Sequence, residues 1–164
     1  MTQEIFLKLE RYFRQHRGMT RLINNANFYL TMLMYVVYPV FLIVGLFAFR
    51  TKLADVFLAP AITFIVATVF RKLFNAKRPY QVYRRSATLA KNSPGQSFPS
   101  RHVACAVAIA WAIFYVSQPF GIALFVISAL IAIIRVIGGV HFISDVLFGA
   151  LIAMNISMLM YVIF

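Results

Sequence analysis

Five apolar segments occupy most of this chain, and they constrain its fold more than any other feature. They cover residues 28–49, 53–70, 102–117, 120–134 and 142–164. A helix needs about 20 apolar residues to cross a bilayer, so we expect the two shortest segments to extend into their flanks or to pack inside the bundle. Hydrophobic residues make up 62% of the chain and charged residues 12%, against about 45–50% and about 25% in soluble domains. The sequence therefore predicts an all-α, polytopic transmembrane helix bundle of about five spans, and it excludes a small soluble enzyme and a disordered chain.

The N-terminal residues form a separate, amphipathic pattern. Over residues 3–17, apolar side chains recur at helical spacing with charged side chains between them. The apolar positions are Ile5, Phe6, Leu9, Tyr12 and Phe13. A helix lying in the membrane interface and a helix docked on the protein's own bundle both fit this pattern. We accordingly divide the chain into an amphipathic interfacial segment, residues 1–27, and a membrane-embedded domain, residues 28–164.

The charge balance narrows the partners and the chemistry. Sixteen Lys and Arg residues face four acidic residues, for a formal net charge of +12. Long apolar runs interrupt the basic residues, which argues against nucleic acid and favours anionic membrane lipids or a phosphorylated substrate. So few carboxylates also argue against a Mg²⁺ or two-metal site, and we expect neither a metal nor a cofactor. Cys105 is the only cysteine, so an intramolecular disulfide is excluded, and we expect it to be a small core residue.

Five crossings would sort the polar connections onto two membrane faces. The N-terminal segment, the polar loop predicted over residues 71–101 and the turn 135–141 would share one face. The turn 50–52, the turn at Gln118-Pro119 and the C-terminus would share the other. Because three polar clusters distant in sequence meet on the first face, we expect the chemistry there.

The third of these clusters contains a histidine and a carboxylate. His141 and Asp145 are four residues apart at the start of a helix, so they lie on one helical face within reach of each other. A carboxylate on one ring nitrogen fixes the tautomer and leaves the other nitrogen free as a nucleophile. Arg135, at the end of the preceding helix, offers planar donors that match phosphate oxygens. An interfacial histidine, a helix-start aspartate and a snorkelling arginine would also fit these residues.

The other two clusters also suit an anion. Residues 97–102 resemble a helix N-terminus, where Ser97 or Ser100 can cap free N–H groups and where anions bind. His102 follows one turn into that helix, in a position to protonate a leaving oxygen. In residues 71–79, Lys72 and Arg78 could clamp a phosphate or could belong to a snorkelling basic belt.

Together the clusters resemble the signature of the type 2 phosphatidic acid phosphatase (PAP2) superfamily, which also includes vanadium haloperoxidases and bacterial acid phosphatases. The family pattern is Lys-x6-Arg-Pro, Pro-Ser-Gly-His and Ser-Arg-x5-His-x3-Asp, and the resemblance covers residues 71–145 within a PAP2-like domain of residues 28–164. It implies that His141 is a nucleophile forming a phospho-histidine, that Asp145 orients it, and that His102 protonates the leaving group and then activates water. It also implies that the phosphoryl oxygens are held, without a metal, by Arg78, Ser100, Arg135 and nearby backbone N–H groups.

Three positions depart from the family pattern. Arg71 occupies the position of the first Lys, with Lys72 one residue later, which leaves open which of them contacts phosphate. Arg101 replaces the Gly of the second motif, and its side chain offers an additional substrate contact. Ile134 replaces the Ser before Arg135 and removes one hydroxyl. None of the three departures affects the two histidines or Asp145.

The resemblance implies an integral-membrane lipid phosphatase of the bacterial cytoplasmic (inner) membrane. Its substrate would be a lipid phosphate or diphosphate, such as undecaprenyl diphosphate, phosphatidylglycerophosphate or phosphatidate. A lipid phosphotransferase with the same intermediate and a non-catalytic lipid-binding protein are the alternatives. Family members generally carry the site on the extracytoplasmic side, whereas fourteen of the sixteen basic residues fall on the face with the motifs and favour a cytoplasmic site. Both orientations remain open.

Overall fold

The structure, a computed structural model, describes residues 2–89 and 94–163, and every regular element within them is a helix. The predicted all-α fold is thus confirmed. The elements are α1 (Gln3–Gln15), α2 (Arg17–Ala48), the 3₁₀ helix η1 (Arg50–Lys52), α3 (Leu53–Phe74), α4 (Pro79–Val82), α5 (Arg101–Val116), α6 (Gln118–Ile137) and α7 (Ile143–Ile163).

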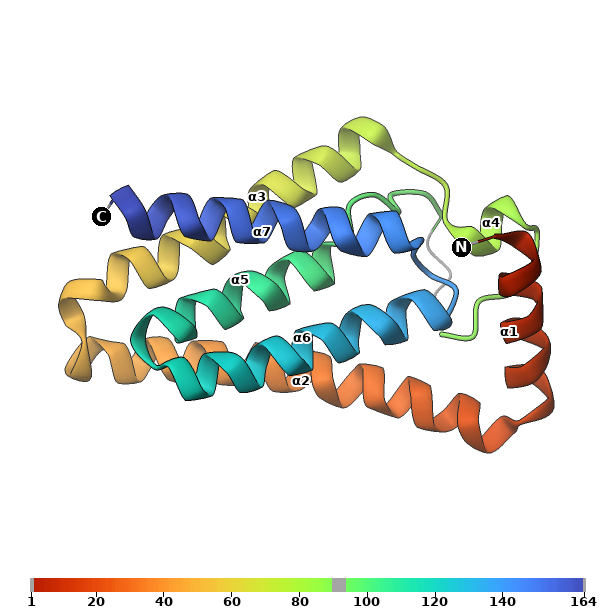
Figure 1. The fold of residues 1–164 in the computed structure, drawn as a ribbon, viewed down its shortest axis with the longest axis horizontal. Coiled ribbons are helices and arrows are strands. Elements are labelled where there is room, and N and C mark those ends of the chain that lie inside the picture. The colour runs from red at the N-terminus through yellow and green to blue at the C-terminus, as the bar shows by residue number, and fades with distance from the viewer. Residues whose placement is uncertain (1, 90–93, 164) are drawn as a thin grey trace.

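The five long helices run alternately in opposite directions, so the connections gather at two ends (Figure 1). We call one of these the polar end, comprising α1, α4, the start of α5 and the turn 138–142. The other is the far end, comprising η1, the turn at Ser117 and the end of α7. This arrangement matches the predicted sorting of the connections onto two faces.

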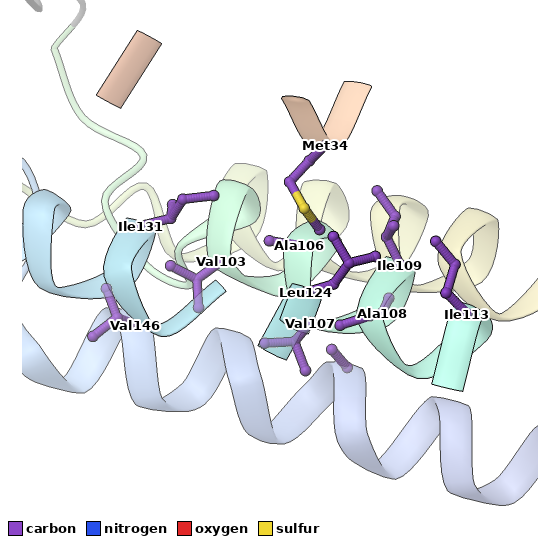
Figure 2. Close-up of a cluster of buried hydrophobic side chains, with 12 residues drawn as sticks. Met34, Val103, Ala106, Val107, Ala108, Ile109, Ile113, Leu124, Ile131 and Val146 are labelled. Carbon is purple, nitrogen blue, oxygen red and sulfur yellow. The ribbon is translucent and has the colours of Figure 1, made fainter. Parts of the chain in front are cut away.

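Helix α5 forms the centre of the bundle. Its buried residues, from Val103 to Ile113, are small or branched and include five alanines, which let neighbouring helices approach closely. They pack against Met34 of α2, Leu124 and Ile131 of α6, and Val146 of α7 (Figure 2). Cys105 was predicted to be a core residue, but its exposure is intermediate, so it is only partly buried.

The outer surface of the bundle is apolar, as a bilayer requires. Large hydrophobic side chains are exposed all along the outer helices, for example Phe28, Phe47, Ile65, Ile133 and Leu159. By length and hydropathy, four described stretches could cross a membrane: Arg17–Ala48, Arg50–Val82, Gln118–Ile137 and Ile143–Tyr161. The fifth helix, α5, has 16 residues and is therefore about 24 Å long. The chain is a multi-pass membrane protein with a short central helix.

Several helices begin or end at residues other than those predicted. The first long helix begins at Arg17 rather than at residue 28, so the predicted division between residues 27 and 28 falls inside α2. Gln118-Pro119 forms the first turn of α6 rather than a connection, because proline fits a first turn, where its missing N–H is not needed. Helix α3 continues to Phe74, so the predicted loop 71–101 begins later. Residues 90–93 of that loop, and Phe164 of the last predicted span, lie outside the described residues.

Helix α1 lies across the polar end of the bundle (Figure 1). Its inner face buries Phe6 and Phe13, and Phe13 packs with Leu89 and Val140. Its outer face leaves Ile5 about half exposed. The helix therefore docks on the bundle, one of the two predicted positions, while it keeps an outer apolar face of the kind that an interfacial helix presents.

Candidate active site

The turn between α6 and α7 positions His141. Gly139 has φ +74°, and a Cβ there would come within 2.7 Å of the Phe6 ring, so only glycine fits this turn against α1. The backbone N–H groups of Val140 and His141 both donate to the Arg135 carbonyl at 3.3 Å. The side chain of His141 is 1% exposed, and its ring is consequently fixed at the polar end.

Asp145 lies in the first turn of α7 and faces this ring. Its Oδ2 is 3.5 Å from His141 Nδ1, and it accepts hydrogen bonds from the Ser97 hydroxyl at 2.5 Å and from the Phe142 N–H at 2.9 Å. The Ser97 oxygen is itself 3.5 Å from Nδ1. These contacts hold the carboxylate beside Nδ1, so the other ring nitrogen, Nε2, is directed to the opposite side.

The protonation state of His141 follows from its surroundings. Burial lowers its pKa from 6.5 to about 4; the hydrogen bond with Asp145 opposes this shift, and the charge of Arg78 adds to it. A neutral imidazole has a lone pair available on Nε2 at neutral pH. The ring therefore meets the requirement for a nucleophile.

Arg78 occupies the Nε2 side of His141. One terminal nitrogen, Nη1, is 3.5 Å from Nε2 and donates to the Val140 carbonyl at 2.9 Å. The other nitrogens of the guanidinium donate to the carbonyls of Gly95 at 3.0 Å and Gln96 at 3.3 Å. Because the side chain is 1% exposed and bonded on three sides, its position is set before any ligand arrives.

Arg71, Ser100 and Arg135 complete a buried cationic cluster. Arg71 donates to the Pro99 carbonyl at 3.2 Å, and it interacts electrostatically with Arg78 and Arg135. Among the described residues, Arg135 Nε and the Ser100 hydroxyl are buried without a hydrogen-bond partner. Buried donors and clustered positive charges are costly unless an anion satisfies them. The arrangement fits a tetrahedral oxyanion such as a phosphoryl group.

The three remaining predicted residues are Lys72, Arg101 and His102. Lys72 is exposed on α3, so the structure brings Arg71 rather than Lys72 into the cluster. The guanidinium of Arg101 lies over the Phe64 ring at 5.2 Å from its centroid. His102 lies in the first turn of α5 and borders a cavity of about 20 Å³ that Thr31 and other residues of α2 help to line. That volume is enough for one water molecule.

Some residues of the site were missed by the sequence analysis. Ser97 was considered only as a helix cap, but it is a hydrogen-bond donor to Asp145; Ser100 is the N-cap of α5, without a capping bond from its side chain. The side-chain oxygen of Gln81 accepts from the N–H groups of Arg78 at 3.0 Å and Gly95 at 2.9 Å. These two bonds join the backbone of Arg78 to Gly95, whose carbonyl accepts a bond from the Arg78 guanidinium.

The chemistry of the site depends on nitrogen bases and cations. In the described part of the chain, no group of three or more His, Cys, Asp or Glu side chains could hold a metal ion. What the site offers is a neutral imidazole with a carboxylate on one nitrogen and arginine donors on the other. This geometry suits nucleophilic attack on a bound phosphoryl group.

Comparisons with known proteins point to one family. The sequence model of the PAP2 superfamily matches residues 52–164, a range that includes all three clusters. The structure is similar to the crystal structure of Aquifex aeolicus LpxE, with 27% identity, a TM-score of 0.68 and coverage of 88% of this chain and 93% of that one. It also has the fold of the transmembrane PAP2 type phosphatidylglycerolphosphate phosphatase from Bacillus subtilis, with 20% identity, a TM-score of 0.65 and coverage of 95% and 90%. No curated protein sequence matches.

Proposed function

The chain belongs to the PAP2 superfamily, and from this premise we propose that it is a membrane lipid phosphatase that works through a phospho-histidine. A multi-pass bundle with a buried anion site at one end supports this proposal. Its structural likeness to a transmembrane phosphatase named for a lipid phosphate, phosphatidylglycerolphosphate, also supports the proposal.

In the first step, His141 attacks the substrate phosphorus. The Nε2 lone pair forms an N–P bond while the P–O bond to the leaving group breaks, and the leaving oxygen takes a proton from His102. Asp145 stabilises the positive charge that develops on the His141 ring. Arg71, Arg78 and Arg135 bind the phosphoryl oxygens and stabilise the charge that is spread over them in the transition state.

In the second step, water releases the phosphate. His102, now neutral, takes a proton from the water, whose oxygen attacks the phosphorus as the N–P bond breaks. Free phosphate leaves, and His141 returns to its neutral form. Protons and bonds balance over the two steps without another reactant.

The observation that carries this proposal is the contrast between the two nitrogens of the His141 ring. Nδ1 faces the carboxylate of Asp145 at 3.5 Å, and Nε2 faces the guanidinium of Arg78 at 3.5 Å. A purely structural histidine has no need of an unprotonated nitrogen aimed at a cationic cluster. A nucleophile for an anionic substrate needs that arrangement.

The location of the site suits a phosphorylated lipid. The cluster lies at the end of the bundle, where a headgroup would be, and the exposed apolar flanks of the helices could receive the lipid tails. Undecaprenyl diphosphate, phosphatidylglycerophosphate and phosphatidate are our candidate substrates, in the bacterial cytoplasmic membrane. The cationic cluster binds the group that they share, the phosphate.

The proposal is tested by phosphate release from these three lipids, with purified protein in mixed micelles and with EDTA present. We expect release from at least one of them, and incorporation of radiolabelled phosphate into the protein as an acid-labile, alkali-stable N–P bond. The matched control is His16→Ala, which changes an exposed histidine on the α1–α2 corner. His141→Ala should lose both signals, whereas His16→Ala should keep them.

Other results would contradict the proposal in distinct ways. Release that needs added Mg²⁺, or that persists in His141→Ala, would contradict the phospho-histidine mechanism. Labelling of His141 with release only after an alcohol acceptor is added would indicate a phosphotransferase. A folded protein with neither labelling nor release on any of the lipids would indicate a non-catalytic lipid-binding protein.

A further inference from the structure

A second, larger cavity lies at the far end of the bundle. Its volume is about 540 Å³, and residues of α5, of the first turn of α6 and of α7 line it. Helix α5 ends at Val116, whereas α7 continues to Ile163. The cavity thus lies among the end of α5, the start of α6 and the end of α7, which meet at the far end of the bundle (Figure 1).

The walls of this cavity are mainly aromatic. The rings of Tyr115 and Tyr161 stack with centroids 4.4 Å apart, and Trp111 meets Phe114 edge to face at 5.5 Å. Met158 also lines the cavity and is 51% exposed, so the cavity opens on the outer, apolar surface of the bundle. Such walls suit the glycerol region and the first acyl carbons of a lipid.

Two polar atoms among the side chains that line this cavity have no protein partner. Trp111 Nε1 and the Tyr161 hydroxyl are buried and make no hydrogen bond within the described residues. Both groups are donors. Because both atoms are buried away from water, leaving these donors unpaired is costly. A ligand whose acceptor oxygens reached these two groups would remove that cost.

The charges around the cavity favour an anion. The ammonium group of Lys52 lies 4.8 Å from the centroid of the Tyr115 ring, and Arg50 belongs to the same turn, η1. Asp55 interacts electrostatically with Tyr161 and opposes them in part. The two basic residues outnumber the one acidic residue, so the local charge is positive.

We infer that this cavity binds a phospholipid with an acidic headgroup, such as phosphatidylglycerol, in the leaflet opposite the active site. Lys52 attracts the phosphate, Trp111 and Tyr161 donate to the lipid's phosphate or ester oxygens, and the aromatic walls hold the start of its acyl chains. This site is separate from the His141 cluster and does not depend on the proposed phosphatase function.

Trp111 makes the inference testable, because it is the only tryptophan in the chain. The full-length protein is reconstituted in phosphatidylcholine vesicles that contain a small fraction of phosphatidylglycerol brominated on its acyl chains near the glycerol. A parallel sample contains the same fraction of brominated phosphatidylcholine. We expect the acidic lipid to quench Trp111 fluorescence several-fold more strongly and to saturate at low mole fraction.

Variants at both ends of the bundle separate specific binding from general contact with lipid. Lys52→Gln and Tyr161→Phe should each reduce quenching by the acidic lipid to nearly that of phosphatidylcholine. Lys8→Gln, which removes one exposed charge on α1, should leave it unchanged. Circular dichroism melting in the same vesicles shows whether each variant is folded, independently of phosphatase activity. Equal quenching of the parent protein by the two lipids would overturn the inference, as would selectivity that both far-end variants retain.

Discussion

Each end of the bundle has an acidic residue in the first turn of an apolar helix, but the two residues have different surroundings. Asp145 of α7, at the polar end, is 3% exposed and accepts bonds from Ser97 and from the Phe142 backbone. Asp55 of α3, at the far end, is half-buried and follows the basic turn η1. The two acidic residues have similar local sequences. What distinguishes Asp145 is Ser97, 48 residues away, and the neighbouring His141.

The same contrast holds for the donors at the two ends. At the polar end, the Arg78 guanidinium is anchored by three backbone carbonyls, so it is organised before a ligand binds. At the far end, Trp111 Nε1 and the Tyr161 hydroxyl have no partner among the described residues. The polar end also has two unpartnered donors, Arg135 Nε and the Ser100 hydroxyl, so what distinguishes it from the far end is the anchored guanidinium of Arg78.

The largest difference between the ends should appear in the two aspartates. In Asp145→Asn, the amide no longer holds the His141 ring in the reactive tautomer, and we expect phosphate release to fall by about 10³–10⁴-fold. Asp55→Asn should change it by no more than about twofold, because it alters a partly exposed charge far from the site. Steady-state kinetics on both variants would measure this. If the two losses were similar, the assignment of Asp145 to His141 would be wrong.

Arginine substitutions probe the same contrast less strongly. Arg78→Lys keeps the charge but loses the forked bonds to the carbonyls of Gly95, Gln96 and Val140, and we expect a loss of about 10²–10³-fold in kcat/KM. Arg50→Lys at the far end should have no measurable effect on the same quantity. If Arg78→Lys left kcat/KM unchanged, the pre-organised donors of Arg78 would not be what makes the polar end active.

The motif spacing predicted which residues of the polar end converge, but not how they are held. Arg78, Arg135, His141 and Asp145 come together with Arg71, one of the two candidates at the first motif position. All of them lie near those ends of the predicted helices that share one face. The support from Ser97 and Gln81 was missed, since it depends on the path of the loop between α4 and α5, which has no periodic pattern.

Fold boundaries failed for a related reason. Residues 17–27 read as part of a polar N-terminal segment, yet they form the first turns of α2. Hydropathy marks where the bilayer begins, whereas a helix continues for as long as its backbone N–H and C=O groups find hydrogen-bond partners. The Asn24 amide bonds the Thr88 carbonyl at 3.1 Å, a tertiary contact that helps to hold this extension and that no local pattern encodes.

Arg71 and Lys72 offer a sharper test within the polar end itself. They are adjacent, but Arg71 is buried and donates a hydrogen bond to the Pro99 carbonyl, whereas Lys72 is exposed. We expect Arg71→Lys to lower kcat/KM by about tenfold to a hundredfold through the lost bond, and Lys72→Gln to lower it by less than about threefold. The reverse order would assign the phosphate contact to Lys72.

The smallest expected effect is the acid response of His141, the buried histidine of the polar end. Burial lowers its pKa to about 4, so its ring resonances should not titrate between about pH 8 and about pH 5, where an ordinary imidazole does. In the unfolded chain, His141 binds a proton near about pH 6.5, whereas in the folded chain it stays neutral down to about pH 4. The contribution of His141 to the free energy of unfolding is therefore full above about pH 6.5 and is lost as the pH falls towards 4. The chain has three histidines, and an NMR titration of their ring carbons, assigned with the His141→Ala spectrum, measures this directly. A titration midpoint near about pH 6.5 for His141 would mean that its ring is solvated. The polar end would then differ from the far end in its charge but not in the burial of its proposed nucleophile.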